Sequence, residues 1–195
     1  MKQLIDSLNT IVPLNDSEIA YLMQHIKTIC VKRKKILLRE GEICQHYIFI
    51  HEGCLKIYGV DENGCSHIMQ FAAEGEWITD EASFYNKTKS SYHIETIENA
   101  IITLIKRDSL YSLFHHTPKF NRIFKVITEQ KYTKLQNRTL LHFSTTAEKR
   151  YELFLNQNKH LANRLSNTQI ASYLGITPQF LSMIRKKRTT KENIY

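Results

Sequence analysis

A short segment near the C-terminus carries side chains that can contact a charged, hydrogen-bonding partner. In the run from Ser166 to Lys187, apolar residues recur at helical spacing and polar residues fill the positions between them. The face opposite the apolar stripe of its second half carries Gln179, Ser182, Met183 and Lys186. An amide can bond an adenine edge, a methionine methyl can touch a thymine methyl group, and cations bind phosphates. These residue types on one face predict a surface that reads double-stranded DNA.

The predicted DNA-binding set also includes the start of each helix and the basic run that follows. It comprises Thr168, Gln169, Thr177, Pro178, Gln179, Ser182, Met183, Arg185, Lys186, Lys187 and Arg188. Thr168 and Gln169 would lie near a helix N-terminus, where backbone amides and the helix dipole favour phosphate. The alternative for the whole segment is an ordinary pair of helices with a solvated basic face.

The elements that must position these side chains are also marked in the sequence. Ser166 to Gln169 has the pattern of a capping box, in which the serine and the glutamine each bond the other's backbone amide. Gly175 is placed to close the first helix in a left-handed conformation. Thr177 and Pro178 then restart the chain as an N-cap and a first-turn proline. Two short helices joined by a three-residue turn predict a helix-turn-helix.

The net charge of +8 is unevenly distributed along the chain. Before Pro118 there are 12 Lys and Arg against 15 Asp and Glu, a balance of −3. From Pro118 onward there are 15 against 4, a balance of +11. This asymmetry predicts that the C-terminal part binds a polyanion.

Hydrophobic periodicity changes twice along the chain. Residues 1–29 have helical spacing, and short β-rich runs punctuated by glycine then continue from Val31 to Lys106. Asp61–Gly64 separates two such runs and predicts a hairpin. Helical spacing returns in a long helix from Pro118 to about His142, and again in Ala147–Gln157. Many short strands at regular spacing favour a jelly roll or another closed β structure.

The segment Asn167–Lys186 resembles the helix-turn-helix of the cyclic-AMP receptor protein/FNR (Crp/Fnr) family of bacterial transcription regulators. Glu148–Tyr151, Gly53–Ile57 and Gly75–Ile78 also resemble that family, and the likeness spans nearly the whole chain. The resemblance implies an α+β fold and a homodimer that reads a two-fold symmetric DNA site. Three domains follow from it: a cyclic-nucleotide-binding-like β jelly roll that senses an effector at 1–117, a long dimerisation helix at 118–142, and a helix-turn-helix domain with a reduced winged helix at 143–195.

The resemblance also locates an effector pocket, and there the sequence departs from the family. The pocket residues are Trp77, Ile78, Thr79, Asp80, Ser90 and Ser91. The family's Gly-Glu pair aligns with Thr79 and Asp80, and its Arg-Ser pair aligns with Ser90 and Ser91. Because no arginine is present to clamp a cyclic phosphate, the effector is expected to be another small molecule, or there is none. On the recognition helix, Gln179 and Met183 replace the family's usual Glu and Arg, so we expect a different DNA target.

Two other functional classes are alternatives for this sequence. A small-molecule-binding module whose basic tail binds a protein, with no DNA binding, is the alternative function. A cupin-like enzyme would use some of the four β-region histidines, His46, His51, His67 and His93, but no His-x-His spacing occurs. We therefore expect no catalysis and no metal. The four cysteines form no CxxC pair, so we expect reduced thiols and no cofactor. No run is long enough to cross a membrane and the N-terminus lacks the pattern of a signal peptide, so we expect a cytoplasmic protein.

Overall fold

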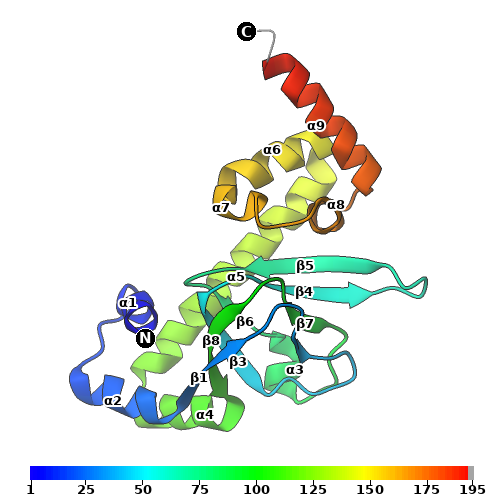
Figure 1. Ribbon diagram of the computed structural model, residues 1–195. Coiled ribbons are helices and arrows are strands. Elements are labelled where there is room, and N and C mark those ends of the chain that lie inside the picture. Colours follow the sequence, from blue (N-terminus) through cyan, green and yellow to red (C-terminus); the bar gives the residue numbers. More distant parts are fainter. Residues whose placement is uncertain (193–195) are drawn as a thin grey trace. The chain divides into compact units, whose positions relative to one another are not determined.

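The computed structural model describes residues 1–192 (Figure 1). In chain order its elements are α1 (Lys2–Asn9), α2 (Asp16–Gln24), β1 (Ile26–Val31), β2 (Ile36–Leu38), β3 (His46–Glu52), β4 (Leu55–Val60), β5 (Ser66–Ala72), β6 (Trp77–Ile78), α3 (Glu81–Asn86), β7 (His93–Thr96), β8 (Ala100–Lys106), α4 (Arg107–His116), α5 (Lys119–Ser144), α6 (Ala147–Gln157), α7 (Lys159–Ala162), α8 (Asn167–Leu174) and α9 (Pro178–Glu192). α9 continues to Glu192, so whatever the predicted reduced wing adds after it lies outside the described residues.

The N-terminal region is helical only in part. α2 begins at Asp16 as predicted, because Asn15 caps it and Glu18 completes a capping box. The prediction of helix up to residue 29 is wrong, because β1 begins at Ile26 and pairs antiparallel with β8. Its β-branched residues suit a strand, and Ile26 and Ile29 pack against the core from that strand. Pairing with a strand more than seventy residues later leaves no local signal in the sequence.

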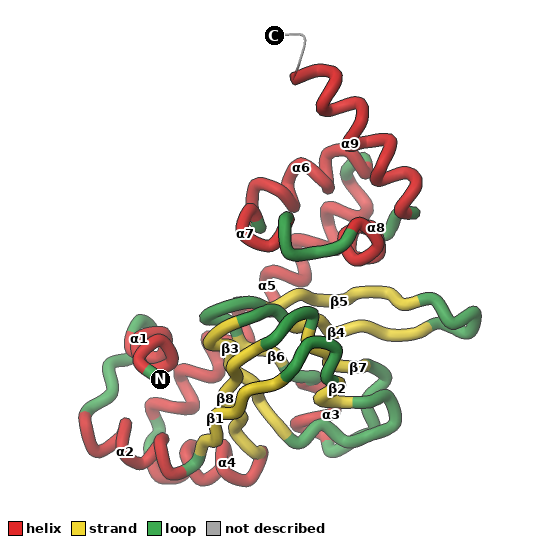
Figure 2. The backbone as a smooth tube through the Cα atoms, in the orientation of Figure 1, coloured by secondary structure: helices red, strands yellow, loops and turns green. Residues whose placement is uncertain are grey.

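Two four-stranded antiparallel sheets form the predicted jelly roll (Figure 2). Their strand orders are β1-β8-β3-β6 and β2-β7-β4-β5. One apolar core joins both sheets to α1, α4 and the first half of α5. The most buried strand in this core is β3, in which Tyr47, Phe49 and Ile50 are fully inaccessible to solvent. The predicted α+β fold is therefore confirmed.

The hairpin predicted at Asp61–Gly64 joins β4 to β5, but with a different turn from the one that Asn-Gly favours. Gly64 has a φ of +78°, whereas Asn63 stays on the negative side. The Asp61 carboxylate accepts hydrogen bonds from the backbone N–H groups of Asn63 and Cys65. The aspartate side chain thus organises the turn, as such side chains commonly do.

The long helix α5 runs from Lys119 to Ser144, close to the predicted bounds. The face of α5 that carries Phe120, Ile123 and Phe124 is buried, and all three side chains are nearly inaccessible. Lys131 follows these residues on α5, and its Nζ donates to Glu81 Oε1 at 2.7 Å and lies 4.8 Å from the centre of the Tyr47 ring. Burial lowers the pKa of Lys131 and the Glu81 carboxylate opposes that shift. The inner face therefore includes a paired lysine.

Contacts divide the chain into two compact units. The first comprises Met1–Gly59 and Gln70–Thr133, and the second comprises Val60–Met69 and the chain from Lys134 onward. The tip of the β4–β5 hairpin thus groups with the C-terminal helices. The three domains drawn from the sequence remain a prediction. Among the described residues, no helix is both long enough and apolar enough to cross a membrane.

Candidate nucleic-acid interface

The first helix of the predicted helix-turn-helix, α8, begins as its sequence indicates. Ser166 caps it, with the Gln169 amide donating to Ser166 Oγ at 3.2 Å and the Ser166 amide donating to Gln169 Oε1 at 2.8 Å. Thr168 is exposed at this N-terminus, whereas Gln169 is half-buried and its side chain closes the cap. Thr168 is therefore the more available of the two for a phosphate.

The turn between the helices has the predicted three residues. Gly175 ends α8 at a φ of +67°, in the left-handed region that glycine adopts without strain. A Cβ on Gly175 would lie 3.2 Å from Cε1 of His142, so the turn is also closely packed. Thr177 then accepts a hydrogen bond at 3.2 Å from the Phe180 amide through its Oγ1, which makes it the N-cap of α9. Pro178 is the first residue of α9.

The apolar face of α9 is buried, as the helical spacing of its apolar residues predicts. Leu181 and Ile184 are buried, as are Ile170, Ala171 and Leu174 on α8. Tyr151 and Phe154 of α6 are buried within the same unit. These apolar contacts orient α9, because a helix of this length gains most of its stability from packing.

The outer face of α9 is open to solvent. Gln179, Lys186, Lys187 and Arg188 are exposed, and Met183 is 49% exposed. Ser182 is half-buried and donates from Oγ to the Pro178 carbonyl at 3.0 Å, within its own helix. Lys186, Lys187 and Arg188 also line a groove of about 800 Å³ together with Glu148 and Glu152 of α6. The cations thus border both the outer face and this groove.

Arg185 differs from the other predicted DNA-binding residues. Its Nε donates to the Tyr151 hydroxyl at 2.8 Å and its Nη1 donates to Asn167 Oδ1. The side chain therefore ties α9 to α6 and α8. The sequence does not predict Tyr151 or Asn167 as partners of Arg185. Tyr151 lies 34 residues before Arg185 in the chain, so no local pattern links them.

Most residues of the predicted effector pocket are buried and hydrogen-bonded within the fold. Ser90 Oγ donates to Asp80 Oδ2 at 2.6 Å, and the Ser83 amide donates to Asp80 Oδ1 at 3.2 Å. Thr79 Oγ1 donates to the His46 carbonyl at 3.0 Å. Trp77, Ile78, Thr79, Asp80 and Ser90 are all buried, and only Ser91 is exposed.

This arrangement lacks the cationic group that the resemblance implies for binding a cyclic nucleotide. By the resemblance, the arginine that clamps a cyclic phosphate aligns with Ser90, so that cation is missing from this chain. Ser90, which would have to donate to the phosphate, already donates to Asp80. The indole N–H of buried Trp77 has no acceptor among the described residues. In the same described part of the chain, no three His, Cys, Asp or Glu side chains gather as a metal site requires.

Comparisons with known proteins agree with this architecture. Residues 28–117 match the cyclic nucleotide-binding domain family. Among solved structures, FixK2 from Bradyrhizobium japonicum aligns with a TM-score of 0.76 at 19% identity, covering 86% of each chain. CLP from Xanthomonas campestris, a c-di-GMP responsive global regulator, aligns with a TM-score of 0.73 at 14% identity, covering 91% of this chain and 93% of its own.

A third structure carries the family name. It is a putative Crp/Fnr-family transcriptional regulator from Eubacterium rectale, with a TM-score of 0.73 at 13% identity, covering 91% of this chain and 85% of its own. No curated protein matches the sequence. Residues 28–117 thus match the cyclic nucleotide-binding domain family, and the chain has the fold of these solved structures, one of which is a putative Crp/Fnr-family regulator.

Proposed function

We propose that this protein is a dimeric, sequence-specific DNA-binding transcription regulator. The observation that carries the proposal is the outer face of α9, which presents Gln179, Met183 and Lys186 to solvent on a helix whose other face is packed. A recognition helix needs this division, because its exposed side chains must reach base edges while the scaffold holds it rigid. The excess of positive charge from Pro118 onward supplies attraction to phosphates.

A homodimer is part of the proposal. The second half of α5 exposes Leu135, Leu140 and Phe143, and Phe143 is 87% exposed. Large apolar side chains left open on one helix favour an interface with another chain. A two-fold dimer would present two recognition helices to a symmetric DNA site.

Cyclic AMP is not the proposed effector. The arginine that would clamp a cyclic phosphate is absent, and Ser90, which the resemblance aligns with it, donates to Asp80. A small-molecule effector of this protein would be a ligand that can bind beside the buried Asp80 carboxylate. We propose no catalytic activity, and we place the protein in the cytoplasm, where its DNA target would be found.

Selection of bound sequences from a random pool of duplex DNA tests this function. The full chain should enrich an inverted repeat whose half-sites lie about one helical turn apart, roughly 10–11 base pairs, or a multiple of it. A protein in which Gln179, Ser182 and Met183 are all changed to Ala should lose or alter the enriched sequence. If the native chain enriches no sequence, the alternative of a small-molecule-binding module with a basic protein-interaction tail replaces this proposal.

A further inference from the structure

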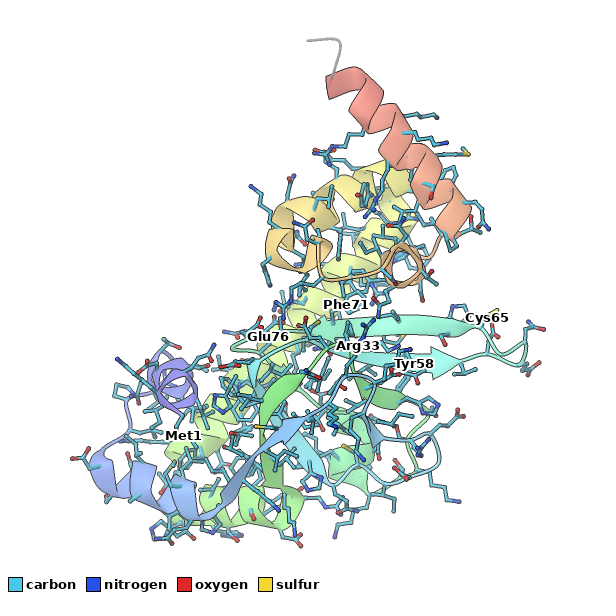
Figure 3. All side chains as sticks on the ribbon, in the orientation of Figure 1. Met1, Arg33, Tyr58, Cys65, Phe71 and Glu76 are labelled. Carbon is cyan, nitrogen blue, oxygen red and sulfur yellow. The ribbon has the colours of Figure 1, made fainter. Side chains whose placement is uncertain are left out.

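The β4–β5 hairpin ends in a strand whose outer edge has no neighbour in its sheet. β5 is the last strand in the order β2-β7-β4-β5, so the backbone groups on one of its edges have no partner strand. Such an edge is normally covered or protected. Figure 3 labels Cys65 at the outer end of this hairpin, directly before β5 begins at Ser66.

Ser172 of α8 bonds to that edge twice. Its Oγ donates to the Ser66 carbonyl at 2.7 Å and accepts from the Ile68 amide at 3.0 Å. Ser66 and Ile68 are two residues apart, so their backbone groups face the same edge. One hydroxyl of the helix-turn-helix thus satisfies two backbone groups of the strand.

Arg138, near the end of α5, bonds to the same strand and to α8. Its Nη2 donates to the Ile68 carbonyl at 3.1 Å and to the Tyr173 carbonyl at 2.9 Å, and its Nη1 donates to the Met69 carbonyl. The guanidinium also lies 4.0 Å from the centre of the Tyr173 ring. A guanidinium spreads five donors over a planar fork and can stack on a ring while it bonds to separate carbonyls, whereas the three donors of an ammonium group all lie on one atom.

These contacts connect α8 to the end of α5. The Tyr173 ring packs on Phe154 of α6 at 5.6 Å between centroids. One turn beyond Arg138, the His142 ring lies against Gly175 at the end of α8. All of these residues belong to the second compact unit.

We propose that Arg138 and Ser172 are positioning residues, which clamp the hairpin tip Val60–Met69 onto α8 and so fix the recognition helix relative to the end of α5. Neither residue touches DNA in this scheme. A dimer that reads a two-fold site needs a fixed spacing between its recognition helices, so a loose clamp would cost affinity for the whole site. This inference rests on the proposed function.

The first test needs no DNA. Hydrogen exchange is measured on the full chain and on Ser172→Ala, which removes the acceptor of the Ile68 amide. We expect exchange at Ile68 to be about tenfold faster in the variant. Ser182→Ala is the control, because the Ser182 hydroxyl bonds within α9 and should leave Ile68 unchanged. Unchanged exchange at Ile68 in Ser172→Ala overturns the clamp, whatever the protein does with DNA.

The second test compares the selected two-fold site with one of its half-sites. Arg138→Met is expected to weaken binding to the full site about tenfold and to the half-site less than about twofold, with the salt dependence unchanged. Arg138→Lys should behave like Arg138→Met. Arg122→Met, at an exposed arginine on the same helix, should bind like the native chain.

Three results would overturn the inference. They are equal losses on both sites, full rescue by lysine, and unchanged affinity for the full site. The first two indicate a direct phosphate contact by Arg138. If Arg138→Met does not fold, Ser172→Ala must show the same difference between full site and half-site. Failure of the native chain to bind any DNA refutes the proposed function, and the exchange measurement still decides the clamp.

Discussion

Arg185 donates from Nε to the Tyr151 hydroxyl at 2.8 Å, and its guanidinium lies 5.5 Å from the centre of that ring. A cation on the recognition helix is thereby turned toward α6. Its third contact, with Asn167, reaches the first turn of α8. Arg185 thus joins three helices of the unit, and we expect it to act in their packing more than in DNA recognition.

Arg185→Ala should therefore lower stability and leave the salt dependence of DNA binding unchanged. Removing hydrogen bonds from a charged, half-buried group is expected to lower the free energy of unfolding by about 1–2 kcal/mol. Tyr151→Phe, which removes only the hydroxyl, should cost about 0.5–1.5 kcal/mol. Urea denaturation measures both. A variant Arg185→Ala with native stability and a shallower salt dependence would show a phosphate contact instead.

Gly175→Ala tests the turn of the helix-turn-helix. Alanine at a φ of +67° is strained, and its Cβ would also press on His142 at 3.2 Å. We expect a loss of roughly 2 kcal/mol or more in the free energy of unfolding. Gly64→Ala is the matched control, because Gly64 has a φ of +78° and a Cβ added there would meet nothing within 4 Å. If both variants lose the same stability, packing against His142 contributes nothing.

The predictable parts of this protein depend on short sequence separations. The capping box at Ser166, the glycine at 175 and the N-cap at Thr177 are all local, and each has the predicted geometry. The hairpin at Asp61–Gly64 is local as well, although its turn type depended on the Asp61 side chain.

The parts that the sequence does not predict depend on pairing between distant residues. Ile26, at the start of β1, pairs with Ile105 of β8. Arg185 of α9 bonds to Tyr151 of α6, although two other helices separate them in the sequence. Arg138 bonds to Ile68, 70 residues earlier. Periodicity identifies the buried face of a helix, but it cannot show which backbone a polar side chain reaches in the folded chain.

Cyclic AMP should not stabilise this protein. Ser90 Oγ, which the resemblance aligns with the family's phosphate-binding arginine, donates to Asp80 Oδ2 at 2.6 Å, and no arginine supplies the missing cation. The melting temperature should therefore be the same with and without millimolar cyclic AMP, because a ligand raises it only by binding the native state. A saturable rise in melting temperature would show that the pocket opens to admit the nucleotide.

Stability should fall as the pH drops from neutrality through the histidine range. Burial lowers the pKa of His46, His51 and His142 below the ordinary value of 6.5. The unfolded chain therefore takes up protons at a higher pH than the native state does. The stabilising contribution is present above pH 6.5 and is lost as the pH falls toward the native pKa values.

Urea denaturation between about pH 5 and pH 8 measures this dependence. His51→Gln should show a shallower loss, because His51 is buried and bonded to Thr103 Oγ1 at 2.7 Å. His160→Gln, at an exposed histidine, should follow the native curve. Stability that is flat or rises between pH 7 and about pH 5 would contradict the assignment.

The salt dependence of DNA binding in Lys186→Ala/Lys187→Ala tests the central claim most directly. Each phosphate contact contributes about 0.9 to the slope of the logarithm of affinity against the logarithm of salt concentration. We predict that the double variant binds the selected site more weakly and with a slope reduced by roughly 1–2. Lys125→Ala, a lysine of the other unit that pairs with Glu129, should leave the slope unchanged. If the double variant keeps both the native affinity and the native slope, the proposal that α9 binds DNA is contradicted.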